Sequence, residues 1–118
     1  MKSSLFNKLA GMILLVALTP AGASAQSVAE FFSGRTVTIL VGSGPGGVTD
    51  TSARIISRYL EQYIPGTPRI IVKNMPGGGT VKATNFIFEK ARPDGLTVQF
   101  GPIFAFNQII DAPGVRFK

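Results

Sequence analysis

The sequence predicts an α/β fold, a parallel sheet built in the order β-α-β-α-β between Thr36 and Phe100. Short β-branched apolar runs alternate with segments of helical periodicity, the pattern of parallel sheets with right-handed crossovers. The connections between them are short and rich in glycine and proline. The first run is almost continuously apolar, as expected for a strand that is buried on both faces.

Residues 1–25 have the three-part pattern of a secretory signal peptide. Lys2 and Lys8 precede the apolar run "LAGMILLVAL", and Ala23-Ser24-Ala25 offers a cleavage site. The run is too short to cross a bilayer, so we expect export and cleavage near Ala25. Loss of the two lysines would lower the net charge from +6 to +4.

The composition of the chain excludes several classes of site. The sequence contains no cysteine and no histidine. A disulfide framework, a thiolate metal site and a lipid-acceptor cysteine are therefore excluded. The basic residues form no concentrated stripe of the kind that nucleic-acid-binding proteins carry, so we expect no nucleic-acid partner. The six acids are scattered, and we expect no metal.

The first strand and helix surround a glycine loop. "TVTILV" (Thr36–Val41) predicts the strand, and a helix is expected over residues 51–64, with Thr49 or Asp50 as its N-cap. Pro65 and Gly66 end this helix. Its predicted apolar stripe consists of Ala53, Ile56, Leu60 and Tyr63. Its predicted polar face consists of Arg54, Arg58 and Glu61.

A second strand, loop and helix repeat the arrangement. "RIIVK" (residues 69–73) predicts a buried strand, "NMPGGG" a second glycine loop, and "TVKATNFIFEKA" (residues 80–91) a helix. The side chains expected to face inward from this helix are Ala83, Phe86 and Ile87. A turn at residues 93–95 leads to a third strand over residues 96–100, which Gly101-Pro102 breaks. We interpret "AEFFSGR" as a lead-in to the first strand, with Gly34 as a break. Residues 103–118 form an apolar tail without clear periodicity, for which we expect a loop or a short helix.

In open α/β sheets, ligands bind beyond the carboxyl ends of the strands. Both glycine loops and Gly101-Pro102 follow predicted strands, so three loops should meet at one sheet edge. Glycines allow close approach of a backbone to a ligand, and a helix N-terminus favours a carboxylate or phosphate. Neutral hydrogen-bonding groups are added by the side chains of Ser43, Thr49, Asn74 and Thr80.

Other interpretations of the first loop remain open. Gly42, Gly44 and Gly47 fit the dinucleotide pattern G-x-G-x-x-G, but the second strand ends in Lys73-Asn74 where an acid is expected. Since a lysine could face a 2′-phosphate, an NADP-binding oxidoreductase domain is the alternative function. A third interpretation is a structural or interaction module whose glycines only serve turns.

The sequence favours a binding protein over an enzyme. The phosphate-loop pattern G-K-[S/T] is absent, and Ser43 lacks the G-x-S-x-G elbow of a nucleophile. Asp50 and Asp94 could pair as acid and base, although each also suits a helix cap or a turn. No other catalytic constellation is apparent.

Three motifs resemble a known family. They are Pro45-Gly46-Gly47-Val48-Thr49-Asp50 after the first strand, Asn74-Met75-Pro76-Gly77-Gly78-Gly79 after the second, and Pro93-Asp94-Gly95 before the third. In this order and spacing they resemble the Bug-type periplasmic substrate-binding proteins of tripartite tricarboxylate transporters. The chain departs from the family pattern at Gly44-Pro45 and at Pro102.

The resemblance implies a monomeric, two-lobed protein of the type II periplasmic-binding fold. Such a protein closes on a small carboxylated solute, needs no cofactor and delivers the solute to membrane permease subunits. Residues 26–118 would form part of the N-terminal lobe of a fragment or truncated product, which by itself would be marginally stable or aggregate. The residues that would contact the ligand, directly or through water, are Ser43, Gly44, Gly46, Gly47, Thr49, Asp50, Asn74, Gly78, Gly79 and Thr80.

Overall fold

The computed structural model of the chain describes residues 26–102 and 109–117. The predicted signal peptide over residues 1–25 lies outside the described residues, as do Phe104 and Phe106 of the apolar tail. Among the described residues, no helix is both long enough and apolar enough to span a membrane.

The described strands form a three-stranded, fully parallel sheet. Its strands are β1 (Thr36–Val41), β2 (Arg69–Asn74) and β3 (Thr97–Phe100), in the order β2-β1-β3. The register pairs Val41, the last residue of β1, with the last residues of both neighbours. All three strands therefore end at one level, and the loops that follow them share one edge, which confirms the predicted parallel sheet.

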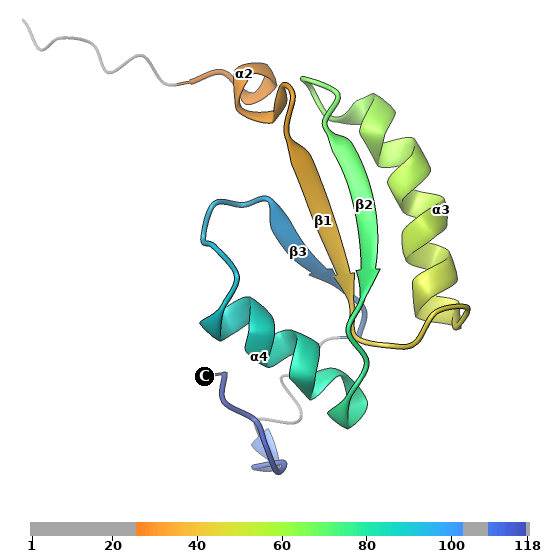
Figure 1. Cartoon of the computed structure of the whole chain (residues 1–118), viewed down its shortest axis with the longest axis vertical. Coiled ribbons are helices and arrows are strands. Elements are labelled where there is room, and N and C mark those ends of the chain that lie inside the picture. The colour runs from red at the N-terminus through yellow and green to blue at the C-terminus, as the bar shows by residue number, and fades with distance from the viewer. Residues whose placement is uncertain (1–25, 103–108, 118) are drawn as a thin grey trace, which may run out of the picture.

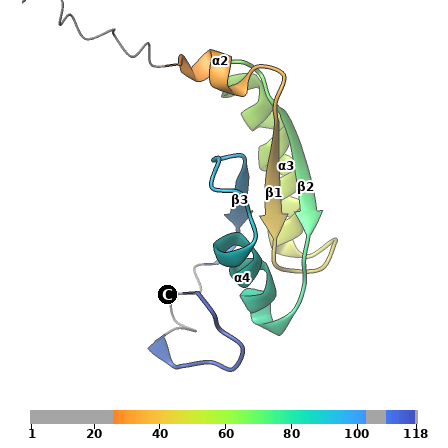
Figure 2. The same ribbon diagram turned by 60° about the vertical axis from the view of Figure 1, so that its left-hand side comes forward.

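The two longer helices cover opposite faces of this sheet. α3 (Val48–Tyr63) connects β1 to β2, and α4 (Val81–Glu89), preceded by the 3₁₀ turn η1 (Gly78–Thr80), connects β2 to β3. Since β1 lies between its two partners, the two crossovers run in opposite directions. Right-handed crossovers then place the helices on opposite faces, as Figures 1 and 2 show.

The core lies on the α3 face. Ile39 and Val41 of β1 pack against Ala53 of α3, and all three side chains are buried. Half-buried apolar side chains from the neighbouring strands surround this cluster, namely Ile70, Val72 and Phe100. On the α4 face, Leu40 and Ala83 are buried. Phe86 and Ile87 are half-buried, so the structure confirms the prediction that Ala83, Phe86 and Ile87 are on the inward side of this helix.

The predicted apolar stripe of the first helix is wrong beyond Ala53. Tyr63 is 79% exposed, whereas Ser57 is buried. Small side chains at positions 53 and 57 allow the helix to lie close to the sheet, which leaves the larger apolar groups at its flanks. The Ser57 hydroxyl donates a hydrogen bond to the carbonyl oxygen of Arg54 (2.9 Å), so its burial leaves no polar atom unpaired.

The lead-in to β1 contains the short helix α2 (Val28–Phe32), for which no element was predicted. The Ser27 hydroxyl accepts a hydrogen bond from the Glu30 N–H, and the Glu30 carboxylate accepts one from the Ser27 N–H. This reciprocal pair is a capping box. Its S-x-x-E signature was present in the sequence.

The carboxyl-terminal residues of the described chain attach to α4. The buried Asn85 side chain donates to the Gly114 carbonyl oxygen (2.7 Å) and accepts from the Arg116 N–H (2.9 Å). The Arg116 guanidinium pairs with Glu89, and Phe117 is buried. These contacts give residues 114–117 a defined position although they contain no regular secondary structure.

Candidate functional site

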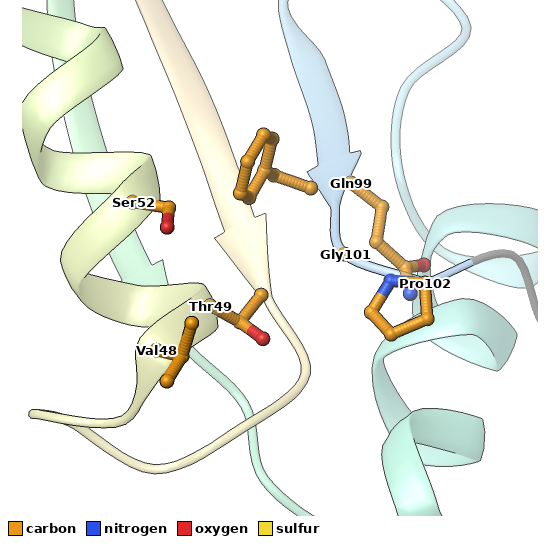
Figure 3. A pocket seen from close by; sticks show the side chains of 7 residues that line it. Val48, Thr49, Ser52, Gln99, Gly101 and Pro102 are labelled. Carbon is orange, nitrogen blue, oxygen red and sulfur yellow. The ribbon is translucent and has the colours of Figure 1, made fainter.

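A hollow of about 330 Å³ lies where the chain switches direction in the sheet, between the N-terminus of α3 and the end of β3. A Cβ added to Gly101 would lie 3.5 Å from Cγ2 of Thr49, so the N-terminus of α3 and the loop after β3 lie close together. Figure 3 shows the Thr49 side chain pointing from α3 toward the loop that follows β3. The residues that line the hollow are Val48, Thr49, Ser52, Gln99, Phe100, Gly101 and Pro102.

The N-terminus of α3 is not capped by a side chain. Its N-cap is Gly47, which makes no side-chain cap bond, so the predicted caps Thr49 and Asp50 are wrong. The helix begins at Val48, and Thr51 donates the first hydrogen bond of the helix to the Gly47 carbonyl oxygen (2.9 Å). The N–H groups of residues 48–50 have no acceptor within the described parts of the chain. Together with the helix dipole, such donors favour an anion.

Asp50 joins the first glycine loop to the end of β2. Its Oδ2 accepts from the Gly46 N–H (2.8 Å) and its Oδ1 from Nδ2 of Asn74 (2.8 Å). Nδ2 of Asn74 also donates to the Ser43 carbonyl oxygen (3.0 Å). The structure thus connects Ser43, Gly46, Asp50 and Asn74, four of the residues predicted to contact a ligand, through hydrogen bonds between protein groups.

Arg54 completes this network and was missed as a site residue. Its Nε lies 3.1 and 3.0 Å from the two carboxylate oxygens of Asp50, and its NH2 group donates to Oδ1 of Asn74 (3.0 Å). These bonds from Arg54, then those from Gly46 and Asn74, lower the pKa of Asp50 to about 2. The signal was in the sequence, because an acid four residues before a base on a helix predicts a side-chain pair.

The two glycine loops also touch through Gly42 and Thr80. A Cβ added to Gly42 would lie 2.5 Å from Cβ of Thr80, so no side chain fits at this position. Thr80 has a φ of +81°, in the left-handed region that costs a threonine energy. The buried hydroxyl oxygens of Ser43 and Thr80 have no hydrogen-bond partner among the described residues.

The remaining residues that were predicted to contact the ligand lie in different parts of the two loops. Gly44 is half-buried in the first loop, and Gly79, with a φ of +56°, is exposed in the second. Gly78 lines a separate hollow of about 320 Å³ beside Lys82 and Arg116. The structure thus brings together the first loop, Asn74 and Thr80, but it gives Gly78 a different neighbourhood. In residues 26–102 and 109–117, no group of three or more acidic side chains could hold a metal.

The fold and site define a parallel α/β domain with an uncapped helix N-terminus at the switch point of its sheet. The chain is similar to UPF0065 proteins. It is 34% identical to a UPF0065 protein of Bordetella pertussis over 80% of this chain and 28% of that protein. It is 31% identical to BugT of the same organism, over 73% of this chain and 26% of BugT.

A third relative is the UPF0065 protein from the tcbD–tcbE intergenic region of Pseudomonas sp. strain P51. The two are 36% identical over 76% of this chain and 25% of the relative. The chain therefore spans about a quarter of each of these relatives. No family model and no solved structure matches the chain. The name of BugT agrees with the resemblance that the three loop motifs indicate.

Proposed function

We propose that this chain is part of one lobe of an extracytoplasmic solute-binding protein that captures a small carboxylate. The lobe would belong to a type II-like periplasmic-binding fold and would deliver its ligand to the permease subunits of a tripartite tricarboxylate transporter. Support comes from the similarity to BugT and the other UPF0065 proteins, and from the order of the three loop motifs. In this proposal the protein binds and carries its solute without chemical turnover.

The uncapped N-terminus of α3 is the observation that carries the proposal. The N–H groups of residues 48–50 precede the first hydrogen bond of the helix, beside the hollow where Thr49 and Ser52 add hydroxyl groups. A carboxylate placed there would accept hydrogen bonds from the free donors and gain from the helix dipole. The contrast with α2 is informative, because there Ser27 fills the corresponding position with its own hydroxyl.

Titration of the isotope-labelled chain with citrate should therefore shift the amide NMR signals of Val48, Thr49 and Asp50. Since the described residues supply only one wall, we expect a Kd no tighter than about 1 mM, or roughly −4 kcal/mol. Thr49→Val, which removes one hydroxyl group at similar volume, should weaken binding by about threefold to tenfold, the effect of one hydrogen bond.

Thr51→Val is the matched control for this titration, because Thr51 is exposed on the same helix and lies outside the hollow. It should leave the citrate affinity unchanged. Shifts confined to other parts of the chain, or equal effects of the two valine variants, would contradict the proposed site. Tight binding of NADPH would favour the oxidoreductase alternative instead.

Export is the second part of the proposal. The basic residues Lys2 and Lys8, the apolar run and Ala23-Ser24-Ala25 support cleavage near Ala25 and a periplasmic location. Mass spectrometry of periplasmic protein from a host that expresses the full chain should find an N-terminus at Gln26 or within one or two residues of it. Recovery of the chain with Met1 intact from the cytoplasmic fraction would contradict export.

A further inference from the structure

We propose that the side chains of Asp50 and Asn74 position the carboxylate site without touching the ligand, and that Arg54 keeps this site attractive to anions by neutralising the Asp50 carboxylate. The inference rests on the proposed function, because it concerns how the same site is held and charged. It assigns to Arg54 a role in anion affinity that neither its place on the helix surface nor the loop motifs indicate.

The hydrogen bonds of Asp50 support a positioning role. The residue is 2% exposed, and both of its carboxylate oxygens are occupied by protein donors. Little of its surface is left for a ligand. The bonds to Gly46 and Asn74 instead attach the first loop to the end of β2, which fixes the entry into α3 next to the hollow.

The charge of Asp50 creates a problem for an anion site. The residue lies in the first turn of α3, so its carboxylate occupies the end of the helix that would otherwise attract a ligand carboxylate. A carboxylate bound at the N–H groups of this first turn would carry the same charge as Asp50, so the two would repel each other, and the burial of Asp50 strengthens the repulsion. An unneutralised Asp50 would therefore oppose the binding that the free N–H groups favour.

Arg54 removes this opposition. Its guanidinium lies 3.0 Å from the Asp50 carboxylate, so the pair presents almost no net charge to the hollow. Lys73, the residue before Asn74, does not take over this role, because it lines a different hollow on the α4 face with Leu40. Arg54 is half-exposed and has no other carboxylate partner among the described residues.

The test compares citrate affinities of the full chain, measured by amide NMR, for three variants. Arg54→Gln should weaken binding by about tenfold, which lies within the range of typical couplings between two sites of a protein. The double variant Asp50→Asn/Arg54→Gln, which removes both charges, should return to within about threefold of wild type. Arg58→Gln removes the same charge from an exposed position one turn later and should change little.

Two further readouts separate charge from structure. The loss in Arg54→Gln should shrink as salt is raised, because screening weakens the uncompensated charge. Arg54→Lys keeps the charge without the planar fork and should bind citrate nearly as well as wild type. If Arg54→Gln does not fold, Asp50→Asn is compared with Asp50→Asn/Arg54→Gln instead; the single variant keeps the Arg54 charge and should bind citrate more tightly, and equal affinities would contradict the inference.

The outcomes distinguish this inference from the proposed function. Failure of the wild-type chain to bind citrate at the α3 amides would overturn the proposed function and this inference with it. Binding by wild type with no loss in Arg54→Gln would overturn only the inference. A double variant as weak as Arg54→Gln, or a lysine variant as weak as the glutamine one, would likewise show that hydrogen-bond geometry and not charge determines the effect.

Discussion

Replacement of Gly42 by valine is expected to abolish the cooperative folding of the chain. A Cβ at this position would lie 2.5 Å from Cβ and 2.7 Å from Cγ2 of Thr80, closer than real side-chain atoms approach. Overpacking of a well-packed region costs about 1–3 kcal/mol and occasionally more, a large share of the roughly 5–15 kcal/mol that stabilises a typical domain. Urea unfolding followed by circular dichroism should find little or no folded baseline.

Gly44→Val provides the matched control. Gly44 belongs to the same loop, but no heavy atom lies within 4 Å of a Cβ built there. Its φ is not in the left-handed region, so the added side chain meets neither a clash nor backbone strain. The Gly44 variant should unfold within about 1 kcal/mol of wild type, as most surface substitutions do. Equal losses in the two variants would refute the contact between the loops as the cause.

A second substitution should rescue the first. Thr80→Gly removes the two atoms nearest to the new side chain, and glycine accepts the φ of +81° without strain. We therefore expect Gly42→Ala/Thr80→Gly to be more stable than Gly42→Ala alone. Such rescue would locate the defect at the junction of the two glycine loops and exclude a general effect of losing a loop glycine.

The strands and their order along the chain were predictable because their signals are local. Continuous β-branched, apolar runs such as Thr36–Val41 occur where a strand is covered on both faces, and the structure has strands at all three predicted places. The start of α3 was not predictable in the same way. A glycine N-cap provides no side-chain signal, so the sequence pointed to the next polar residues, Thr49 and Asp50.

The site was predictable only as a region. The pairing of Asp50 with Arg54 is a local signal of helical spacing, but the bond from Asn74 depends on the register that ends β2 beside β1. The contact between Gly42 and Thr80 depends on a threonine in a left-handed conformation, which no residue preference indicates. Tertiary contacts of this kind lie beyond what composition and periodicity contain.

Replacement of Asn74 by aspartate should destabilise the chain strongly at neutral pH and reverse its response to acid. The substitution is almost isosteric, but it exchanges the amide donor for a carboxylate oxygen 2.8 Å from Oδ1 of Asp50. It also removes the donor to the Ser43 carbonyl oxygen. Two carboxylates this close cannot both stay ionised without a large cost, and a shared proton relieves the repulsion. At pH 7 we expect Tm to fall by roughly 10 °C or more.

The sign of the pH effect follows from the protons bound in each state. In the wild type the pKa of Asp50 is lowered to about 2, so its stabilising contribution is present above the unfolded pKa and is lost as the pH falls toward 2. In Asn74→Asp the folded pair has one raised pKa and binds more protons than the unfolded chain. Its stability should therefore rise as the pH falls from 7 toward about 4, the ordinary pKa of an aspartate.

Thermal unfolding at pH 7, 6, 5 and 4 checks this prediction, with Gln99→Glu as the control. Gln99→Glu makes the same change from amide to carboxylate, but the Gln99 amide faces the Thr84 hydroxyl, whose single proton can turn from the Thr80 carbonyl oxygen to the new carboxylate. The control should therefore lack the recovery between pH 7 and 4 that Asn74→Asp shows. If Asn74→Asp were as stable as wild type at pH 7, or lost stability on acidification, Asn74 and Asp50 would not be in contact, and the hydrogen bonds that hold the first loop to β2 would be refuted.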